Sequence, residues 1–175
     1  MKHLIIYAHP NPESLNGHLK QTLAEHLWNS GQEVIIRDIQ GQRMGKVTND
    51  VEQEQEFISW ADHITFIYPI WWTGMPAIMK GYIDRVFSYG FAYRYDKGVQ
   101  KGLFTGKQTT VINTHGKSQA EYEEIGMHKA LSLTSDKGIF TYCGLEINQH
   151  FFFDKADRPA PESIENWARE ITSNY

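Results

Sequence analysis

The chain alternates short apolar segments with amphipathic segments along most of its 175 residues. The apolar segments are rich in β-branched and aromatic residues, which is typical of strands that are buried on both faces. Strands are expected at residues 2–8, 33–39, 62–68, 108–114 and 145–153. Helical patterns are expected between and after them, at residues 15–30, 50–61, 76–87, 127–142 and 162–171.

This alternation constrains the fold class strongly. Strands that alternate with helices form parallel βαβ units, in which helices cover both faces of one sheet. Five strands in a chain of this length fit an α/β doubly wound parallel sheet with the strand order 2-1-3-4-5. No internal repeat, low-complexity tract or domain boundary interrupts the pattern, so residues 1–175 are expected to form a single domain. Residues 41–49 and 90–106 are expected to be irregular.

Composition excludes several classes of protein. The 17 basic and 21 acidic residues give a formal charge of −4, which argues against a nucleic-acid or anionic-lipid partner. The apolar segments are far shorter than the ~20 residues of a membrane span, and the N-terminus lacks a signal-peptide pattern. A cytoplasmic protein without membrane insertion is therefore expected. Cys143 is the single cysteine, expected as a small buried residue, and the eight histidines show no metal-ligand spacing.

Three loops follow strands 1, 3 and 4 of the expected sheet, at residues 9–16, 69–75 and 113–122. In a sheet of this order, ligands bind outside the carboxyl ends of the strands, at the switch point beside strand 1. The three loops are therefore expected to lie together and to form the ligand site.

The first loop leads into a helix N-terminus, where unpaired backbone N–H groups and the helix dipole attract an anion such as a phosphate. Ser14 and Asn16 offer a hydroxyl and an amide, and His9 offers a ring N–H or a positive charge. Alternatively, Ser14 only caps the helix and His9 only ends the strand. Neither a dinucleotide fingerprint nor a P-loop motif is present, so a phosphate site here would be of another kind.

The second loop contains two adjacent tryptophans, Trp71 and Trp72, after a buried strand. Both cannot point into the same core, so at least one is expected to face a ligand. Ten of the 23 aromatic residues lie between Phe66 and Tyr95, which is more than core packing requires. Large aromatic side chains favour a flat ring such as isoalloxazine. The alternative is a tryptophan that only covers the end of the sheet.

The third loop begins with the small and polar residues Asn-Thr-His-Gly at 113–116, whose backbone can approach a ligand closely. Tyr122 and His128 follow, and both could face the same pocket as hydrogen-bond donors. For each of these two side chains, a surface position or an internal hydrogen bond is the alternative interpretation.

Seven motifs together carry a resemblance to a known family: IIYAHP at 5–10, SLN at 14–16, YPIWW at 68–72, MPAIMKG at 75–81, DRVF at 84–87, GFAY at 90–93 and YCG at 142–144. The block at 68–93 is highly specific, because chance would rarely assemble these motifs in this order. The chain resembles the flavodoxin-like NAD(P)H:quinone oxidoreductases, which include the mammalian two-electron quinone reductases and short bacterial members. The resemblance covers most of the chain and implies a flavodoxin-like fold.

The resemblance also implies a flavin site. The flavin would be held at its phosphate end by His9, Ser14, Leu15 and Asn16, along its ring by Pro69, Ile70, Trp71, Trp72 and Thr73, and at its pyrimidine edge by Asn113, Thr114, His115 and Gly116. Tyr122 and His128 match the catalytic tyrosine and histidine that the family places beside the flavin and the substrate. The family often has Thr-Thr-Gly-Gly at 113–116, and its tyrosine is offset by one residue.

The cofactor and activity follow from the same resemblance. The chain ends near the fifth helix, without the C-terminal extension of the FAD-binding members, which favours FMN over FAD. The implied activity is a ping-pong transfer of hydride from NAD(P)H to the flavin and then to a quinone. Tyr122 and His128 would donate hydrogen bonds or a proton where negative charge develops.

The resemblance also implies a homodimer, because family members usually bind each flavin at the subunit interface. Three other functions remain open from the sequence. The first is a regulatory subunit of a glutathione-gated potassium efflux transporter. The second is an azo- or nitroreductase on the same scaffold. The third is a one-electron carrier, although the small net charge of −4 does not favour it.

Overall fold

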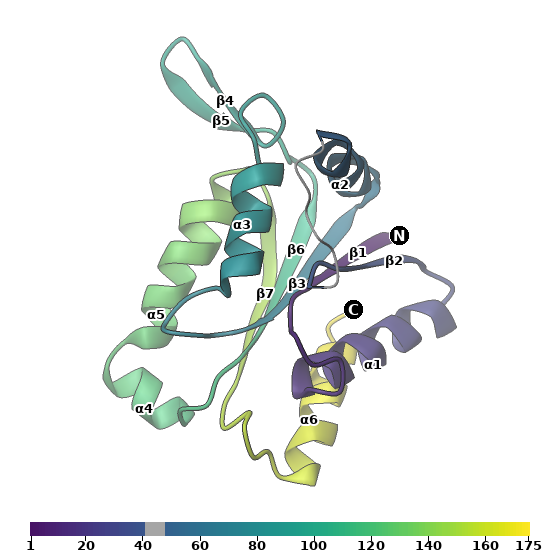
Figure 1. The fold of residues 1–175 in the computed structure, drawn as a ribbon, viewed down its shortest axis with the longest axis vertical. Helices are drawn as coiled ribbons and strands as arrows, with labels where there is room; N and C mark the ends of the chain where they lie inside the picture. The colour runs from purple at the N-terminus through teal and green to yellow at the C-terminus, as the bar shows by residue number, and fades with distance from the viewer. Residues whose placement is uncertain (41–47) are drawn as a thin grey trace.

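The computed structural model describes residues 1–40 and 48–175, and its centre is a five-stranded sheet (Figure 1). The strands are β1 (Lys2–Tyr7), β2 (Glu33–Asp38), β3 (His63–Pro69), β6 (Gln108–Thr114) and β7 (Glu146–Phe153). All neighbouring pairs are parallel, in the order β2-β1-β3-β6-β7. This is the expected 2-1-3-4-5 order of the main strands, so the predicted fold class is confirmed.

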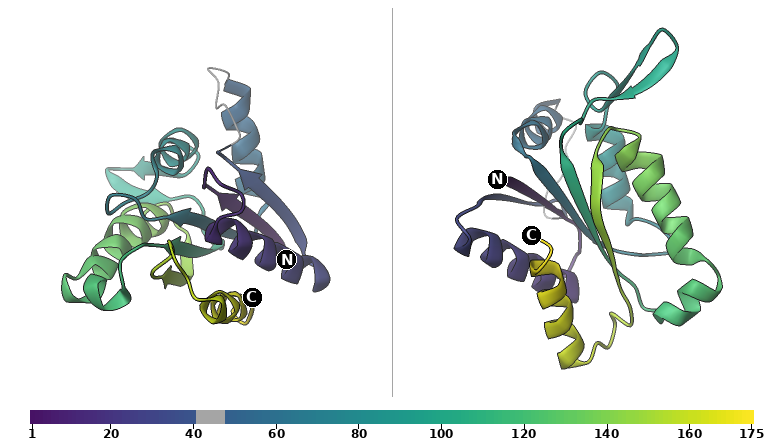
Figure 2. Two further views of the ribbon diagram at one scale, coloured as in Figure 1. Left: turned by 60° about the horizontal axis from the view of Figure 1, so that its bottom comes forward. Right: turned by 180° about the vertical axis from the view of Figure 1, so that it is seen from behind.

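Helices cover both faces of the sheet (Figure 2). On one face lie α1 (Leu15–Asn29) and α6 (Pro161–Thr172). On the other lie α2 (Thr48–Trp60), α3 (Ala77–Val86), α5 (Met127–Ser132) and the π-helix η1 (Leu133–Thr141). Side chains of a strand alternate between the two faces, so Leu4 of β1 packs on the face covered by α2 and α3, whereas Ile5 packs on the face covered by α1.

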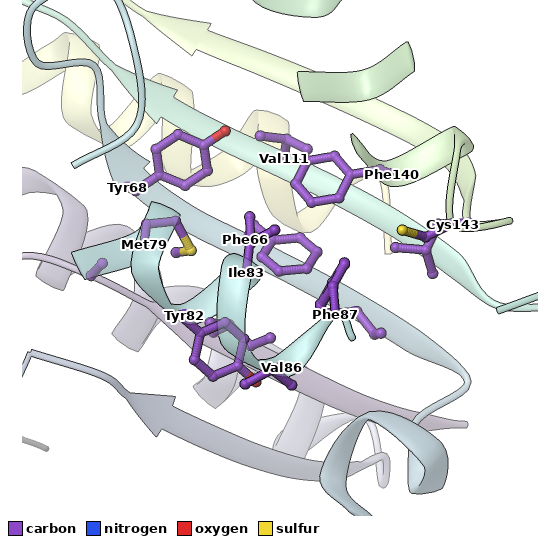
Figure 3. Close-up of a cluster of buried hydrophobic side chains, with 14 of the residues drawn as sticks. Phe66, Tyr68, Met79, Tyr82, Ile83, Val86, Phe87, Val111, Phe140 and Cys143 are labelled. Atoms are coloured by element: carbon purple, nitrogen blue, oxygen red, sulfur yellow. The ribbon is translucent and has the colours of Figure 1, made fainter. Parts of the chain in front are cut away.

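The larger core lies between the sheet, α3 and η1 (Figure 3). Met79, Tyr82 and Val86 come from successive turns of α3 and are fully buried beside Phe66 of β3. Phe140 of η1 stacks on Phe66, with ring centroids 4.5 Å apart. Burial of each large apolar side chain contributes roughly 1.5–3 kcal/mol, so this core holds β3 and the loop that follows it in place.

Residues 90–106 were expected to be irregular, and this prediction is wrong. They contain a hairpin of β4 (Tyr93–Asp96) and β5 (Val99–Gly102), which pair antiparallel. The two turn residues, Lys97 and Gly98, have φ values of 51° and 82°. A turn with positive φ at both positions matches the twist of a two-stranded ribbon, and glycine tolerates it best. The hairpin projects from the body at the end opposite the loops that follow β1, β3 and β6 (Figure 1).

Three other segments differ from the expected elements. The single helix expected at 127–142 is α5 followed by η1, whose backbone bonds run from residue i to i+5. Residues 119–122, expected to lie in a loop, begin α4 (Gln119–Glu124), and its capping box of Ser118 and Glu121 is a sequence signal that was missed. Of the segment 41–49, residues 41–47 lie outside the described residues, whereas the last two begin α2.

Cys143 is buried, as expected, and burial raises the pKa of its thiol to about 11. Within residues 1–40 and 48–175, no three His, Cys, Asp or Glu side chains are grouped so that they could hold a metal ion. In the same ranges, no helix combines the length and the apolar character that crossing a bilayer requires.

Candidate functional site

The loops that follow β1, β3 and β6 meet at the carboxyl edge of the sheet, as expected. The ends of the strands are in register, with Pro69 beside Thr114 and Thr114 beside Phe153. The Ile70 N–H donates to the Thr114 carbonyl at 2.7 Å, and the His115 N–H donates to the Phe153 carbonyl at 2.9 Å. These backbone bonds fix the loops against one another and therefore fix the side chains that project from them.

A cavity of about 210 Å³, which we call the loop cavity, lies between these loops. It is lined by ten of the thirteen residues expected to bind the cofactor: His9, Ser14, Leu15, Asn16, Pro69, Ile70, Trp71, Thr114, His115 and Gly116. Ala156 and Asp157 complete the lining, and the sequence reasoning missed them. They follow β7, which ends at the same edge of the sheet, so the topological argument that selected the other loops could have found them.

The first loop folds tightly onto the N-terminus of α1. Ser14 is the N-cap, and its side-chain oxygen accepts a hydrogen bond from the Gly17 N–H at 3.2 Å. A Cβ atom at Gly17 would lie 1.8 Å from the Pro12 carbonyl oxygen, so only glycine allows this close approach. The capping role of Ser14 is therefore present, and the positive end of the helix dipole lies beside the loop cavity.

Asn16 lines this cavity and carries a buried acceptor that has no partner. Its side chain is 2% exposed, and its Nδ2 donates to Thr114 Oγ1 at 2.7 Å, whereas its Oδ1 is buried without a hydrogen-bond partner. Such an atom costs about 1–3 kcal/mol, which a ligand with a hydrogen-bond donor would relieve. The Asp157 carboxylate adds a second acceptor to the lining. The cavity therefore fits a ligand that carries hydroxyl or N–H groups.

Trp71 and Trp72 lie in a strained turn after β3. The Trp71 and Gly74 backbones exchange hydrogen bonds of 3.0 and 3.1 Å, and Trp72 and Thr73 between them have φ values of 49° and 60°. Non-glycine residues rarely adopt this conformation, and such strain is concentrated at functional sites. Trp72 is 99% exposed and Trp71 is 44% exposed, so both lie outside the core, as expected for at least one of them.

A second cavity of about 440 Å³, the outer cavity, is lined by Trp72 and Thr73. Its other walls come from α4, the start of α5 and the residues between and before them: Lys117, Glu121, Tyr122, Glu124, Ile125 and Met127. Three residues predicted for the site, Trp72, Thr73 and Tyr122, thus lie together outside the loop cavity. Aromatic and apolar walls with a few polar groups suit a flat ring with polar substituents.

Tyr122, His115 and His128 form a cluster of rings between the cavities. His115 stacks on Tyr122 with ring centroids 4.3 Å apart, and His115 Nε2 lies 3.2 Å from His128 Nε2. The rings of Tyr122 and His128 are 5.5 Å apart, edge to face. His128 lines a separate polar cavity of about 280 Å³, beside Asp154. Burial lowers the pKa of both histidines and raises the pKa of Tyr122.

Asn113 does not line the loop cavity but a fourth cavity of about 290 Å³ between the β3 loop and η1. Its Nδ2 donates to the Tyr68 carbonyl at 3.1 Å, and its Oδ1 lies 2.8 Å from His150 Nε2. A carbonyl only accepts, so the amide orientation is fixed and His150 Nε2 must donate. His150 Nδ1 donates to Asp136 at 2.9 Å. The His150 ring therefore links Asn113 of β6 to the buried carboxylate of Asp136.

Comparison with known proteins identifies the family and the relatives of the chain. The Flavodoxin_2 family model, described as a flavodoxin-like fold, matches residues 1–174. The chain is 38% identical over 161 residues to an uncharacterized NAD(P)H oxidoreductase of Haemophilus influenzae, covering 83% of this chain and 80% of that relative.

Two solved structures extend the comparison. A candidate quinone reductase from Klebsiella pneumoniae superposes with a TM-score of 0.90 at 30% identity, over 99% of this chain and 83% of that one. General stress protein 14 from Treponema denticola, solved in complex with FMN, superposes with a TM-score of 0.78 at 25% identity, over 99% of this chain and 97% of that one.

Proposed function

The chain belongs to the Flavodoxin_2 family, among its NAD(P)H oxidoreductases and quinone reductases, and we propose that it is an FMN-dependent NAD(P)H:quinone oxidoreductase. The observation that carries the proposal is the loop cavity, which combines a helix N-terminus with the unpaired buried acceptor of Asn16. The FMN complex of the Treponema denticola relative supports FMN as the flavin.

The lining of the loop cavity fits the parts of FMN. His9 and Ser14, at the N-terminus of α1, would hold the phosphate, since the helix dipole there favours an anion. Asn16 Oδ1 and the Asp157 carboxylate would accept hydrogen bonds from the ribityl hydroxyls. Trp71 and the backbone at 114–116 would border the ring. When bound, FMN supplies the chemistry of accepting a hydride from NAD(P)H and giving it to a second substrate.

The outer cavity is the proposed site for the nicotinamide and the quinone in turn. Trp72 and Met127 provide apolar surface for a flat ring. The Tyr122 hydroxyl would donate a hydrogen bond to the quinone oxygen on which negative charge develops. Because one cavity serves both substrates, the oxidised nicotinamide must leave before the quinone binds. This order predicts ping-pong kinetics.

A homodimer is part of the proposal. Trp72 at the outer cavity and Tyr95 and Val99 of the projecting hairpin are 99%, 53% and 62% exposed. A second copy that covered these side chains would remove their apolar surface from water. Light scattering at micromolar concentration should give twice the mass of one chain. A mass equal to one chain would contradict the dimer.

The experiment that tests the cofactor is identification of the flavin. The purified protein should show a flavin spectrum, and the flavin released on heating should co-elute with FMN. Asn16→Ala and Asp157→Asn should each weaken FMN binding roughly tenfold, since each removes one hydrogen-bond acceptor. Asp96→Asn is the matched control, because Asp96 pairs with Lys101 in the hairpin, far from the loops. Protein that neither retains nor binds FMN contradicts the proposal.

The experiment that tests the reaction uses the FMN-loaded protein. Initial rates with NADH or NADPH and a benzoquinone should give parallel double-reciprocal lines, as ping-pong kinetics requires. An azo dye and a nitroaromatic serve as competing acceptors. Turnover of either one without turnover of the quinone would overturn the assignment of the acceptor.

A further inference from the structure

His115 lies at the meeting point of the loop cavity, Tyr122 and His128. It is 2% exposed, and both of its ring nitrogens have partners. Nδ1 lies 2.9 Å from the Lys117 carbonyl oxygen, and Nε2 lies 3.2 Å from His128 Nε2. A histidine with both nitrogens engaged has its protonation dictated by those partners.

The Lys117 carbonyl fixes the order of protons in this cluster. A carbonyl oxygen only accepts, so His115 Nδ1 carries a proton. Burial lowers the pKa of His115, and the nearby His128 lowers it further, so the ring is neutral at pH 7 and its Nε2 is bare. Two bare nitrogens at 3.2 Å would repel each other, so His128 Nε2 carries a proton and donates it to His115.

We propose that His115 is a positioning residue, which holds His128 in the tautomer protonated at Nε2 and fixes the ring plane of Tyr122. The hydrogen bond between the two histidines holds the tautomer of His128. The stack of His115 on Tyr122, with only 14° between the ring planes, fixes the orientation of the tyrosine ring. Phe152 stacks on His128 at 4.5 Å, so the ring that His115 orients is also held by a second contact.

The chemical meaning of this proton order rests on the proposed function. A neutral His128 presents only Nδ1, which accepts a proton and does not donate one. It becomes a donor only after Nδ1 has taken up a proton. The groups around it oppose one another, because burial and His150 disfavour the protonated ring whereas Glu123 and Asp154 favour it. In the resting state Tyr122 is therefore the hydrogen-bond donor of this cluster toward a substrate.

Nitrogen-15 NMR of histidine-labelled protein tests the proton order, in the flavin-free and the FMN-loaded protein alike. At pH 7.5 the spectra should show His115 protonated at Nδ1 alone and His128 protonated at Nε2 alone. The first of these is informative, because histidine in water prefers the other tautomer. His115 protonated at Nε2, or at both nitrogens, overturns the proposal.

Substitution of His115 tests the positioning role. In His115→Leu the acceptor is lost, so His128 should populate both tautomers and the quinone half-reaction should slow roughly 10- to 100-fold, as expected for a misplaced reacting group. In His115→Gln the amide oxygen can accept from His128, which should restore its tautomer and recover most of the rate. His18→Leu, at an exposed position of α1, is the matched control.

The outcomes distinguish a failure of the positioning role of His115 from a failure of the proposed function. An unchanged His128 tautomer and rate in His115→Leu would overturn the positioning role. If that variant does not fold, the wild-type spectrum still decides the proton order. If the spectra show the expected order but the FMN-loaded protein does not reduce quinones, the proposed function fails and the positioning of His128 by His115 stands.

Discussion

Two clusters, each of two histidines and a tyrosine, lie at opposite ends of the same sheet. In the amino-end cluster, His3 and His63 are register partners on β1 and β3, with ring centroids 5.3 Å apart. Tyr175, the last residue, stacks on His63 at 4.9 Å. Both histidines are 3% exposed, and His3 Nδ1 has no hydrogen-bond partner. None of the three side chains lines any of the four cavities described above.

The carboxyl-end cluster, which is His115, His128 and Tyr122, has the same composition but a different setting. Each of its side chains lines a different cavity. Burial lowers the histidine pKa values in both clusters. The two clusters have the same residue types, so their position relative to the cavities determines what a change of protonation affects. We expect titration of the amino-end cluster to change stability, and titration of the carboxyl-end cluster to change reactivity.

The largest expected effect comes from a third histidine, His150, which has a carboxylate partner that both clusters lack. Asp136→Asn removes the carboxylate that contacts the His150 ring inside the core, where the His150 and Asp136 side chains are only 6% and 10% exposed. Breaking a buried pair in this way should cost about 3 kcal/mol, measured by urea denaturation at pH 7. Asp96→Asn, in an exposed pair, should cost less than about 1 kcal/mol. Equal costs for the two would show that the buried pair does not stabilise the fold.

The next largest effect is the pH dependence of stability that arises from the amino-end cluster. Burial, with a smaller contribution from His3, lowers the pKa of His63 to about 4. The unfolded chain therefore binds more protons between pH 6.5 and 4, and stability is lost as the pH falls through this window. The free energy of unfolding should drop by about 2 kcal/mol from pH 7 to pH 5 through His63 alone. His63→Leu should flatten the pH dependence by that amount. An equal slope in both proteins would contradict the assignment.

The carboxyl-end cluster should respond in rate rather than in stability. Tyr122→Phe removes the hydroxyl that we propose as a donor to the quinone oxygen, so stopped-flow measurement should show the quinone half-reaction about tenfold slower. The free energy of unfolding should change by less than about 0.5 kcal/mol, because none of the hydrogen bonds described here involves this hydroxyl. A tenfold loss in the nicotinamide half-reaction as well would indicate a general defect of the site.

The smallest effect is expected from Tyr175→Phe, which removes the tyrosine hydroxyl of the amino-end cluster. The Tyr175 hydroxyl lies 2.5 Å from Thr65 Oγ1, and burial raises the pKa of this tyrosine to about 12. Tyr175→Phe should cost about 1 kcal/mol of stability, measured in urea, with both half-reactions unchanged. Tyr89→Phe, at a 64% exposed position, is the control. A slower half-reaction in Tyr175→Phe would remove the distinction between the two clusters.

The sheet order could be predicted from the sequence because it follows from a local pattern. Alternation of apolar segments and amphipathic helices leaves few topologies, and the doubly wound order is the common one for five strands. The hairpin was missed because its turn is Lys97-Gly98, flanked by strands of only four residues. The π-helix was missed because its apolar residues resemble those of an α-helix.

The candidate site also has features that could be predicted from the sequence and features that could not. The loop residues could be predicted, because the ends of parallel strands bring adjoining loops together. The direction of the Asn113 side chain could not, because it depends on His150 and Asp136, which lie 37 and 23 positions further along the chain. The proton order of His115 likewise depends on one backbone carbonyl, that of Lys117, which no motif marks.

The π-helix η1 determines how the fold would respond to the deletion of one residue. Bonds from residue i to i+5 hold an extra residue in a turn that an α-helix would have no room for. Deletion of one residue usually breaks the register of a helix, but within Leu133–Thr141 it would regularise the turn. The same deletion would rotate the helix by about 100° and carry Asp136 away from His150. A one-residue deletion in this segment would therefore also remove the buried contact between His150 and Asp136.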